Sequence, residues 1–187
     1  IRVAKTMEAN GWEVIQVRHG KLREKLFSKK GGSTFKKWLE DEIGDYELQA
    51  LLLIKEPEEL KSHLQKKYKN IKSFCQPVSP EDLYQGLRDF GGHDVEQLTK
   101  AMEASKKNQR KPSIIIAHTL KGWGLEMEAE QGNHSSLPSR SEMQELQKAQ
   151  GLAEDTLFAG FAANTPEGKF LSQRREELYS QMQEQWN

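Results

Sequence analysis

Lys121 and His134 are the residues whose types best suit anion binding and proton transfer. Lys121 lies in the segment 118–124, which reads His-Thr-Leu-Lys-Gly-Trp-Gly and follows a run of isoleucines. A lysine amine is a mobile cation that can meet phosphate, and glycine neighbours let a backbone approach a ligand closely. Lysine and spaced glycines also occur in purely structural loops, so the segment alone leaves both interpretations open.

His134 belongs to a second polar segment, 132–136, which reads Gly-Asn-His-Ser-Ser. Long polar connections are uncommon in compact domains unless they are functional or disordered. A histidine in such a loop can transfer a proton or stabilise developing negative charge near neutral pH. It can equally be an ordinary surface residue, and the spacing alone does not decide between the two.

The turn 91–94, Gly-Gly-His-Asp, has a structural interpretation. Its glycines would form a tight bend, Asp94 would cap the helix that follows, and His93 would hydrogen-bond within the turn. His19 and the single cysteine, Cys75, have no partner at a meaningful spacing, and we interpret them as a surface residue and a buried or bystander thiol. The sequence contains no nucleotide-binding, zinc-protease or nucleophile-elbow motif.

The elements around Lys121 predict an α/β fold. Residues 113–118 predict a strand buried on both faces, as parallel sheets require, and residues 12–17 predict a second strand after a helix that ends at Asn10-Gly11. An amphipathic helix precedes the strand at 113–118. Its predicted apolar face consists of Val95, Leu98, Met102 and Ser105. Ligands of open α/β sheets bind at the carboxyl ends of strands, where Lys121 would lie.

The rest of the chain predicts helices. Residues 21 to about 90 are charged and carry little strand signal, so we predict a helical insertion whose lysine-rich stretches are solvated. Leu60 and Leu64 are spaced as on one helix face, and Ser79 is a predicted helix cap. Two further helices are predicted, from about 141 to 150 and from 165 to 182.

Composition excludes several classes of partner. The 28 Lys and Arg residues balance 28 Asp and Glu residues, so there is no global field to attract nucleic acid or an anionic membrane. The longest apolar runs, 51–54 and 114–117, are too short to span a bilayer. No signal-peptide pattern opens the chain, and we expect a cytoplasmic location. Because the sequence begins with Ile1 and not Met, we expect a fragment, with tag removal as the alternative.

The order of these segments resembles the cofactor domain of the transketolase-like superfamily. The resemblance rests on Gly-His-Asp at 92–94, Lys-Pro at 111–112, the strand, Thr-x-x-Gly-x-Gly at 119–124 and the Gly-x-His loop at 132–134. Segments 11–17, 44–46, 91–94 and 117–124 are similar to those of the homodimeric type of pyruvate dehydrogenase decarboxylating component. Segments 166–168 and 173–175 continue the pattern, so the resemblance covers nearly the whole chain.

The resemblance implies part of a parallel sheet flanked by helices, in the thiamine-diphosphate-binding fold. Residues 1–150 would be part of the diphosphate-binding domain, with the helical insertion at about 21–90, and 151–187 a peripheral helical segment leading to the next domain. The implied function is oxidative decarboxylation of pyruvate and reductive acetylation of a lipoyl group. Thiamine diphosphate and magnesium are the implied cofactors.

The resemblance also gives roles to two residues and names the partners. Lys121 would bind the anionic end of the cofactor, and His134 would contact the cofactor and act as a catalytic residue on a mobile loop. The implied partners are the remainder of the same polypeptide, a second copy in a homodimer and the lipoyl acyltransferase component, without nucleic acid or membrane.

Two departures limit this transfer. His134 directly follows Asn133, whereas the pyruvate enzymes place the loop histidine slightly later, so its position or the substrate could differ. The Gly-Asp-Gly metal motif is missing, because residues 44–46 read Gly-Asp-Tyr. We therefore expect the metal ligands before Ile1, a partner domain after Asn187, and an isolated chain that is inactive. A transketolase-like sugar transfer and a non-catalytic interaction module that retains the fold are the alternatives.

Overall fold

The computed structural model describes residues 2–108, 110–153 and 160–186. The chain divides between Leu137 and Pro138 into two compact units. Each unit is described by itself below. The first contains a small parallel sheet and a cluster of short helices, and the described part of the second contains two helices.

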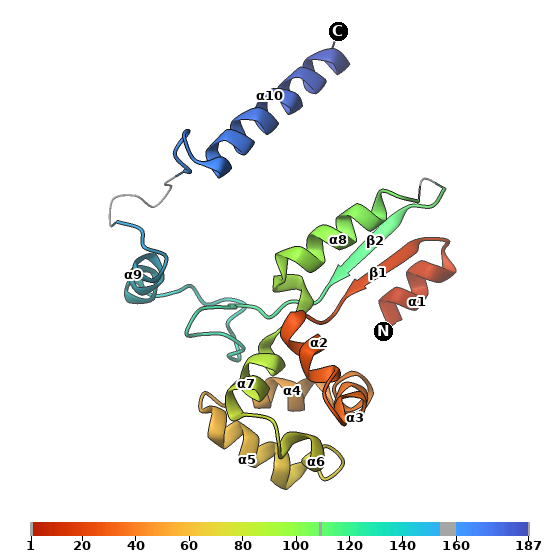
Figure 1. Ribbon diagram of the computed structural model, residues 1–187, viewed down its shortest axis with the longest axis vertical. Coiled ribbons are helices and arrows are strands. Elements are labelled where there is room, and N and C mark those ends of the chain that lie inside the picture. Colours follow the sequence, from red (N-terminus) through yellow and green to blue (C-terminus); the bar gives the residue numbers. More distant parts are fainter. Residues whose placement is uncertain (1, 109, 154–159, 187) are drawn as a thin grey trace. The chain divides into compact units, whose positions relative to one another are not determined.

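A pair of parallel strands forms the sheet of the first unit (Figure 1). β1 (Glu13–Val17) pairs with β2 (Ser113–Ala117), with Glu13 opposite Ser113 and Val17 opposite Ala117. Helix α1 (Arg2–Ala9) contacts β1, and helix α8 (Val95–Ser105) contacts both strands. β-branched residues favour these strands. Gly11, at φ +82°, forms the turn between α1 and β1. The structure confirms the predicted α/β arrangement.

Two details of that prediction are wrong for the described residues. The side chains of β2 are half-buried and Ala117 is exposed, because two strands with one shared helix cannot cover both faces of a sheet. On α8, Val95 and Met102 are 76% and 55% exposed, and the buried position is Ala101. A small side chain lets the helix approach the strands closely, and this contact turns the larger residues outward.

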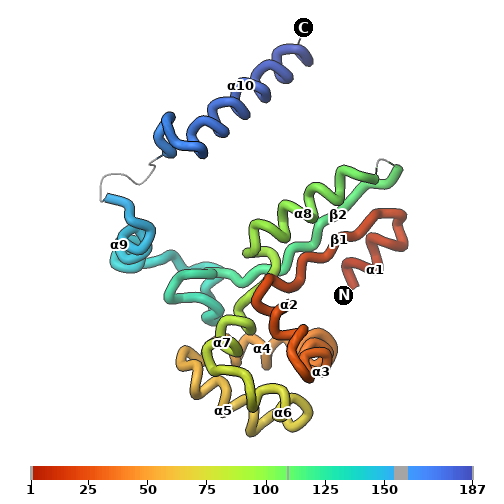
Figure 2. The backbone as a smooth tube through the Cα atoms, in the orientation of Figure 1, coloured from red at the N-terminus to blue at the C-terminus, as the bar shows by residue number. Residues whose placement is uncertain are grey.

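The segment between the strands is helical, as predicted (Figure 2). It contains a series of short helices: α2 (Lys21–Phe27), α3 (Gly32–Lys37), the π-helical η1 (Trp38–Glu42), α4 (Asp45–Leu52), α5 (Pro57–Lys67), α6 (Lys72–Cys75) and α7 (Pro80–Arg88). A 3₁₀ turn, η2 (Gly91–His93), connects α7 to α8. Ser79 caps α7 as predicted, because its side chain accepts a hydrogen bond from the amide of Asp82.

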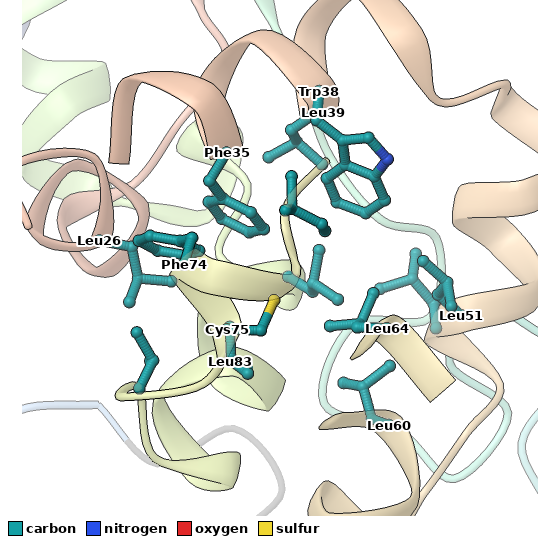
Figure 3. Close-up of a cluster of buried hydrophobic side chains, with 14 of the residues drawn as sticks. Leu26, Phe35, Trp38, Leu39, Leu51, Leu60, Leu64, Phe74, Cys75 and Leu83 are labelled. Atoms are coloured by element: carbon teal, nitrogen blue, oxygen red, sulfur yellow. The ribbon is translucent and has the colours of Figure 1, made fainter. Parts of the chain in front are cut away.

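These helices enclose the main hydrophobic cluster of the described residues (Figure 3). The ring of Phe35 stacks on Phe74 at a centroid distance of 4.6 Å and on Trp38 at 5.6 Å. Leu60 and Leu64 are fully buried, as their spacing predicts. The segment is therefore a packed helical layer with its own core, and its assignment as an insertion stays a prediction.

The second unit contains α9 (Arg140–Ala149) and α10 (Pro166–Trp186), close to the predicted ranges. A complete capping box, formed by Ser139 and Glu142, begins α9. α9 groups with this unit by its contacts, whereas we predicted residues 1–150 as one domain portion; that domain assignment stays a prediction. Residues 154–159, which fall in the predicted C-terminal segment, lie outside the described residues. No helix in the described part of the chain is long and apolar enough to cross a membrane.

Candidate functional site

The structure brings the two predicted site residues, Lys121 and His134, into contact. The Lys121 Nζ donates a hydrogen bond to the backbone oxygen of His134 at 3.0 Å and lies 3.2 Å from its Nδ1. A lysine ammonium has donors and no acceptor, so Nδ1 must accept and the ring proton must be on Nε2. The pair therefore presents a cation beside an imidazole N–H donor.

A series of turns after β2 carries this pair. Gly122, Gly124 and Gly132 have positive φ values of 74°, 80° and 84°, which favour glycine. The Asn133 side-chain amide donates to the backbone oxygens of Lys121 at 3.1 Å and Met127 at 3.2 Å. Asn133 thus closes the segment into a loop. Sequence reasoning noted Asn133 only as the neighbour of His134, and spacing alone gave no signal for this role.

Residues of the helical layer contact the loop and stabilise it. Ala129 is 5% exposed within the hydrophobic cluster and has a φ of 63°, which is rare for a residue with a Cβ. The Gln49 side chain donates to the Ala129 backbone oxygen at 3.2 Å. An ion pair of 3.4 Å joins Arg88 of α7 to Glu128, and both side chains are nearly buried. Glu128 also accepts the Gly124 N–H at 3.0 Å.

A cavity of about 220 Å³ lies between α4 and the loop. Leu48, Leu52 and Leu120 contribute apolar walls, and Lys121 and Asn133 contribute polar groups. The cavity therefore borders the same lysine that contacts His134. Its size suits a small group and not a whole cofactor.

The turn before α8 also contacts the loop, through His93. His93 was predicted to bond within its own turn, but its Nε2 accepts the backbone N–H of Leu120 at 2.7 Å. Its ring also stacks on the indole of Trp123 at 4.6 Å with an interplanar angle of 9°. Burial lowers the pKa of His93 from its ordinary value, which favours the neutral ring that this bond requires. Asp94 caps α8 as predicted, by accepting the amides of Glu96 and Gln97.

A second polar cluster lies where β1 and β2 end. The prediction that His19 is a surface residue is wrong, because its side chain is 8% exposed and its Nε2 lies 2.7 Å from a Glu40 carboxylate oxygen. His118, directly after β2, has a buried Nε2 that finds no hydrogen-bond partner among the described residues. Burial, and then the nearby Arg18, lower the pKa of His118. Their positions within two residues of the strand ends are the sequence signal that could have indicated them.

Fold and site together define a class of protein. A parallel α/β pair carries a lysine and a histidine on the loop after a strand's carboxyl end, and the sequence profile described as "Transketolase, thiamine diphosphate binding domain" matches residues 83–187. This range is more than half of the chain, and the chain belongs to that family. The predicted resemblance and fold class are confirmed.

Several curated relatives are called pyruvate dehydrogenase E1 component. The chain is 29% identical over 178 residues to the one from Haemophilus influenzae, covering 90% of this chain and 19% of that protein. It is 27% identical over 127 residues to the one from Escherichia coli K12, and the match covers 67% of this chain and 14% of that protein. It is 28% identical over 124 residues to the one from Buchnera aphidicola subsp. Acyrthosiphon pisum, and the match covers 66% of this chain and 13% of that protein. The chain thus spans about a fifth or less of these relatives' length.

The residues present fit one end of thiamine diphosphate. Among the described residues, no carboxylate forms an ion pair with Lys121, so its charge is available to an anionic group. His134 is exposed beside it and can offer a hydrogen bond. Within residues 2–108, 110–153 and 160–186, no group of three or more His, Cys, Asp or Glu side chains could hold a metal ion. The site therefore suits the diphosphate and carries no metal centre in the described residues.

Proposed function

We propose that this chain is the diphosphate-facing portion of a pyruvate dehydrogenase decarboxylating component. The observation that carries the proposal is the contact between Lys121 and His134 on the loop after β2. Membership of a thiamine-diphosphate-binding family and the names of the relatives support it. The reaction would be oxidative decarboxylation of pyruvate with transfer of the two-carbon unit to a lipoyl group.

The roles of the two side chains follow from their chemistry. Bound thiamine diphosphate supplies the electron sink for loss of carbon dioxide from a 2-oxo acid. Lys121 would hold the anionic end of the cofactor, because an ammonium is attracted to a nearby anion and can donate hydrogen bonds to it. Its contact leaves the proton of His134 on Nε2, where it can donate to negative charge that develops nearby.

The proposal extends to parts outside the described residues. Magnesium prefers oxygen ligands and would be held by residues elsewhere in the complete protein, since the described residues offer no group of three or more possible ligands. A second copy in a homodimer, the rest of the polypeptide and a lipoyl acyltransferase would be its partners, in the cytoplasm. The isolated chain would be inactive.

Steady-state kinetics of the complete protein test the proposal, with pyruvate, thiamine diphosphate, magnesium and a dye that accepts electrons. K121M removes the charge and keeps most of the side-chain length, so we expect a cofactor KM at least tenfold higher. K66M is the matched control on the exposed face of α5, and it should behave as wild type. H134Q should lower kcat at saturating cofactor.

The outcomes separate the alternatives. Formation of a ketose from sugar phosphates without turnover of pyruvate would indicate transketolase-like transfer. Absence of magnesium-dependent cofactor binding in the complete protein would indicate a non-catalytic module. Turnover by the purified 187-residue chain alone would contradict the claim that it lacks part of the site.

A further inference from the structure

Lys121 lies between two residues that contact a single imidazole. Leu120, directly before it, donates its backbone N–H to the His93 Nε2 at 2.7 Å. Trp123, two residues after it, stacks its indole on the same ring at 4.6 Å and 9°. His93 thus contacts the loop on both sides of the lysine, although 27 residues separate it from Leu120 in sequence.

The turn that carries His93 packs directly against the start of the loop. The Gly92 N–H donates to the backbone oxygen of His118 at 2.8 Å. A Cβ at position 92 would lie 2.5 Å from that oxygen and 2.6 Å from the Thr119 side chain. Real Cβ atoms essentially never approach backbone so closely, so the turn and the loop are in direct contact.

We infer that His93 is a positioning residue: its neutral imidazole holds the loop so that Lys121 is directed to the anionic end of the cofactor. The inference rests on the proposed function. The bond from Leu120 requires an unprotonated Nε2, which places the ring proton on Nδ1. A proton added to Nε2 would set two donors against each other, and the bond would be lost.

Burial and the neighbouring charges determine the pH at which His93 takes up a proton. Burial is the main influence and lowers its pKa, while the Glu128 carboxylate on the loop favours the protonated form. Asp94, the next residue, is already engaged as the cap of α8. Because burial outweighs the carboxylate, the bond to Leu120 should hold at neutral pH and weaken only as the pH falls towards the lowered pKa of His93.

Two variants of the complete protein separate the acceptor from the ring. H93F keeps an aromatic ring for Trp123 and removes the acceptor, so we expect the KM for thiamine diphosphate to rise about three- to tenfold, the effect of one hydrogen bond. The kcat at saturating cofactor should change less than the KM does. H93Q retains an acceptor that does not titrate, and it should restore much of the affinity. H63F, at an exposed histidine of α5, is the matched control.

The pH profile is the readout that a merely structural role would not move. In wild type the cofactor KM should rise as the pH falls from 7.5 to 5.5, and H93Q should flatten this rise. An H93F protein with the KM and pH profile of H63F would overturn the inference and leave the proposed function intact. Absence of cofactor binding in wild type would instead contradict the proposed function, and the inference with it.

Discussion

The nearly buried ion pair between Arg88 and Glu128 should stabilise the closed state of the loop that follows β2 and carries Lys121 and His134. The two side chains are 9% and 13% exposed, and Arg88 Nε lies 3.4 Å from the carboxylate. Glu128→Gln keeps the shape and an acceptor for the Gly124 N–H but removes the charge. Breaking a buried pair from one side destabilises by about 3–5 kcal/mol, since the remaining charge is left uncompensated.

The expected magnitude lies at the lower end of that range. Arg88 keeps hydrogen bonds to the backbone oxygens of Leu52 and Ile54 and lies 3.6 Å from the centre of the Tyr84 ring. We therefore expect the loop to open more easily by about 3 kcal/mol, or roughly a hundredfold in the opening equilibrium.

Hydrogen exchange of the complete protein measures this opening directly. Amides of residues 122–130 should exchange roughly a hundredfold faster in Glu128→Gln, while those of β1 should not change. Glu96→Gln is the matched control, because Glu96 pairs with Lys21 and Lys100 at the surface, where such pairs contribute about 0–1 kcal/mol. Equal exchange in both variants would refute the idea that the helical layer anchors the loop through this pair.

Three further predictions concern the helical layer and the strand ends. Phe74→Ala should lower the free energy of unfolding by about 3–5 kcal/mol, measured by denaturant titration, because Phe74 is 2% exposed and stacks on Phe35. Burial raises the pKa of the Cys75 thiol to about 11, so a thiol reagent at pH 8 should react only after denaturant is added; immediate labelling would show an open core. Burial lowers the pKa of His118, so the unfolded state takes up its proton first and stability should decline as the pH falls below 6.5. His118→Gln should reduce that decline between pH 7.5 and 5.5, and an unchanged slope would contradict the assignment.

Local sequence patterns predicted the elements of this fold well. The isoleucine run, the Asn10-Gly11 stop and the caps at Ser79 and Asp94 each act through neighbours within four residues, so their outcome is visible in sequence. Burial was predicted less well. β2 was expected to be covered on both faces, but coverage depends on which elements lie beside a strand.

For the site, too, the features that depend on nearby residues were predicted better than the contacts between residues far apart in sequence. Lys121 and His134 were proposed for one site because of their residue types and a resemblance, and the structure places them in contact. Their roles toward a cofactor stay predictions. The contact between His93 and Leu120 joins residues far apart in sequence, so no spacing rule could reveal it. Sequence spacing indicated Leu60 and Leu64 in the lysine-rich segment but not the extent of the core around them, because its apolar residues are spread over several short helices.

A crystal structure of the complete protein with thiamine diphosphate and magnesium would test the central claim most directly. The account predicts that the Lys121 Nζ lies within hydrogen-bond distance of a diphosphate oxygen, with the His134 ring facing the same cofactor. A structure in which the cofactor is bound and both side chains point to unrelated surfaces would contradict it.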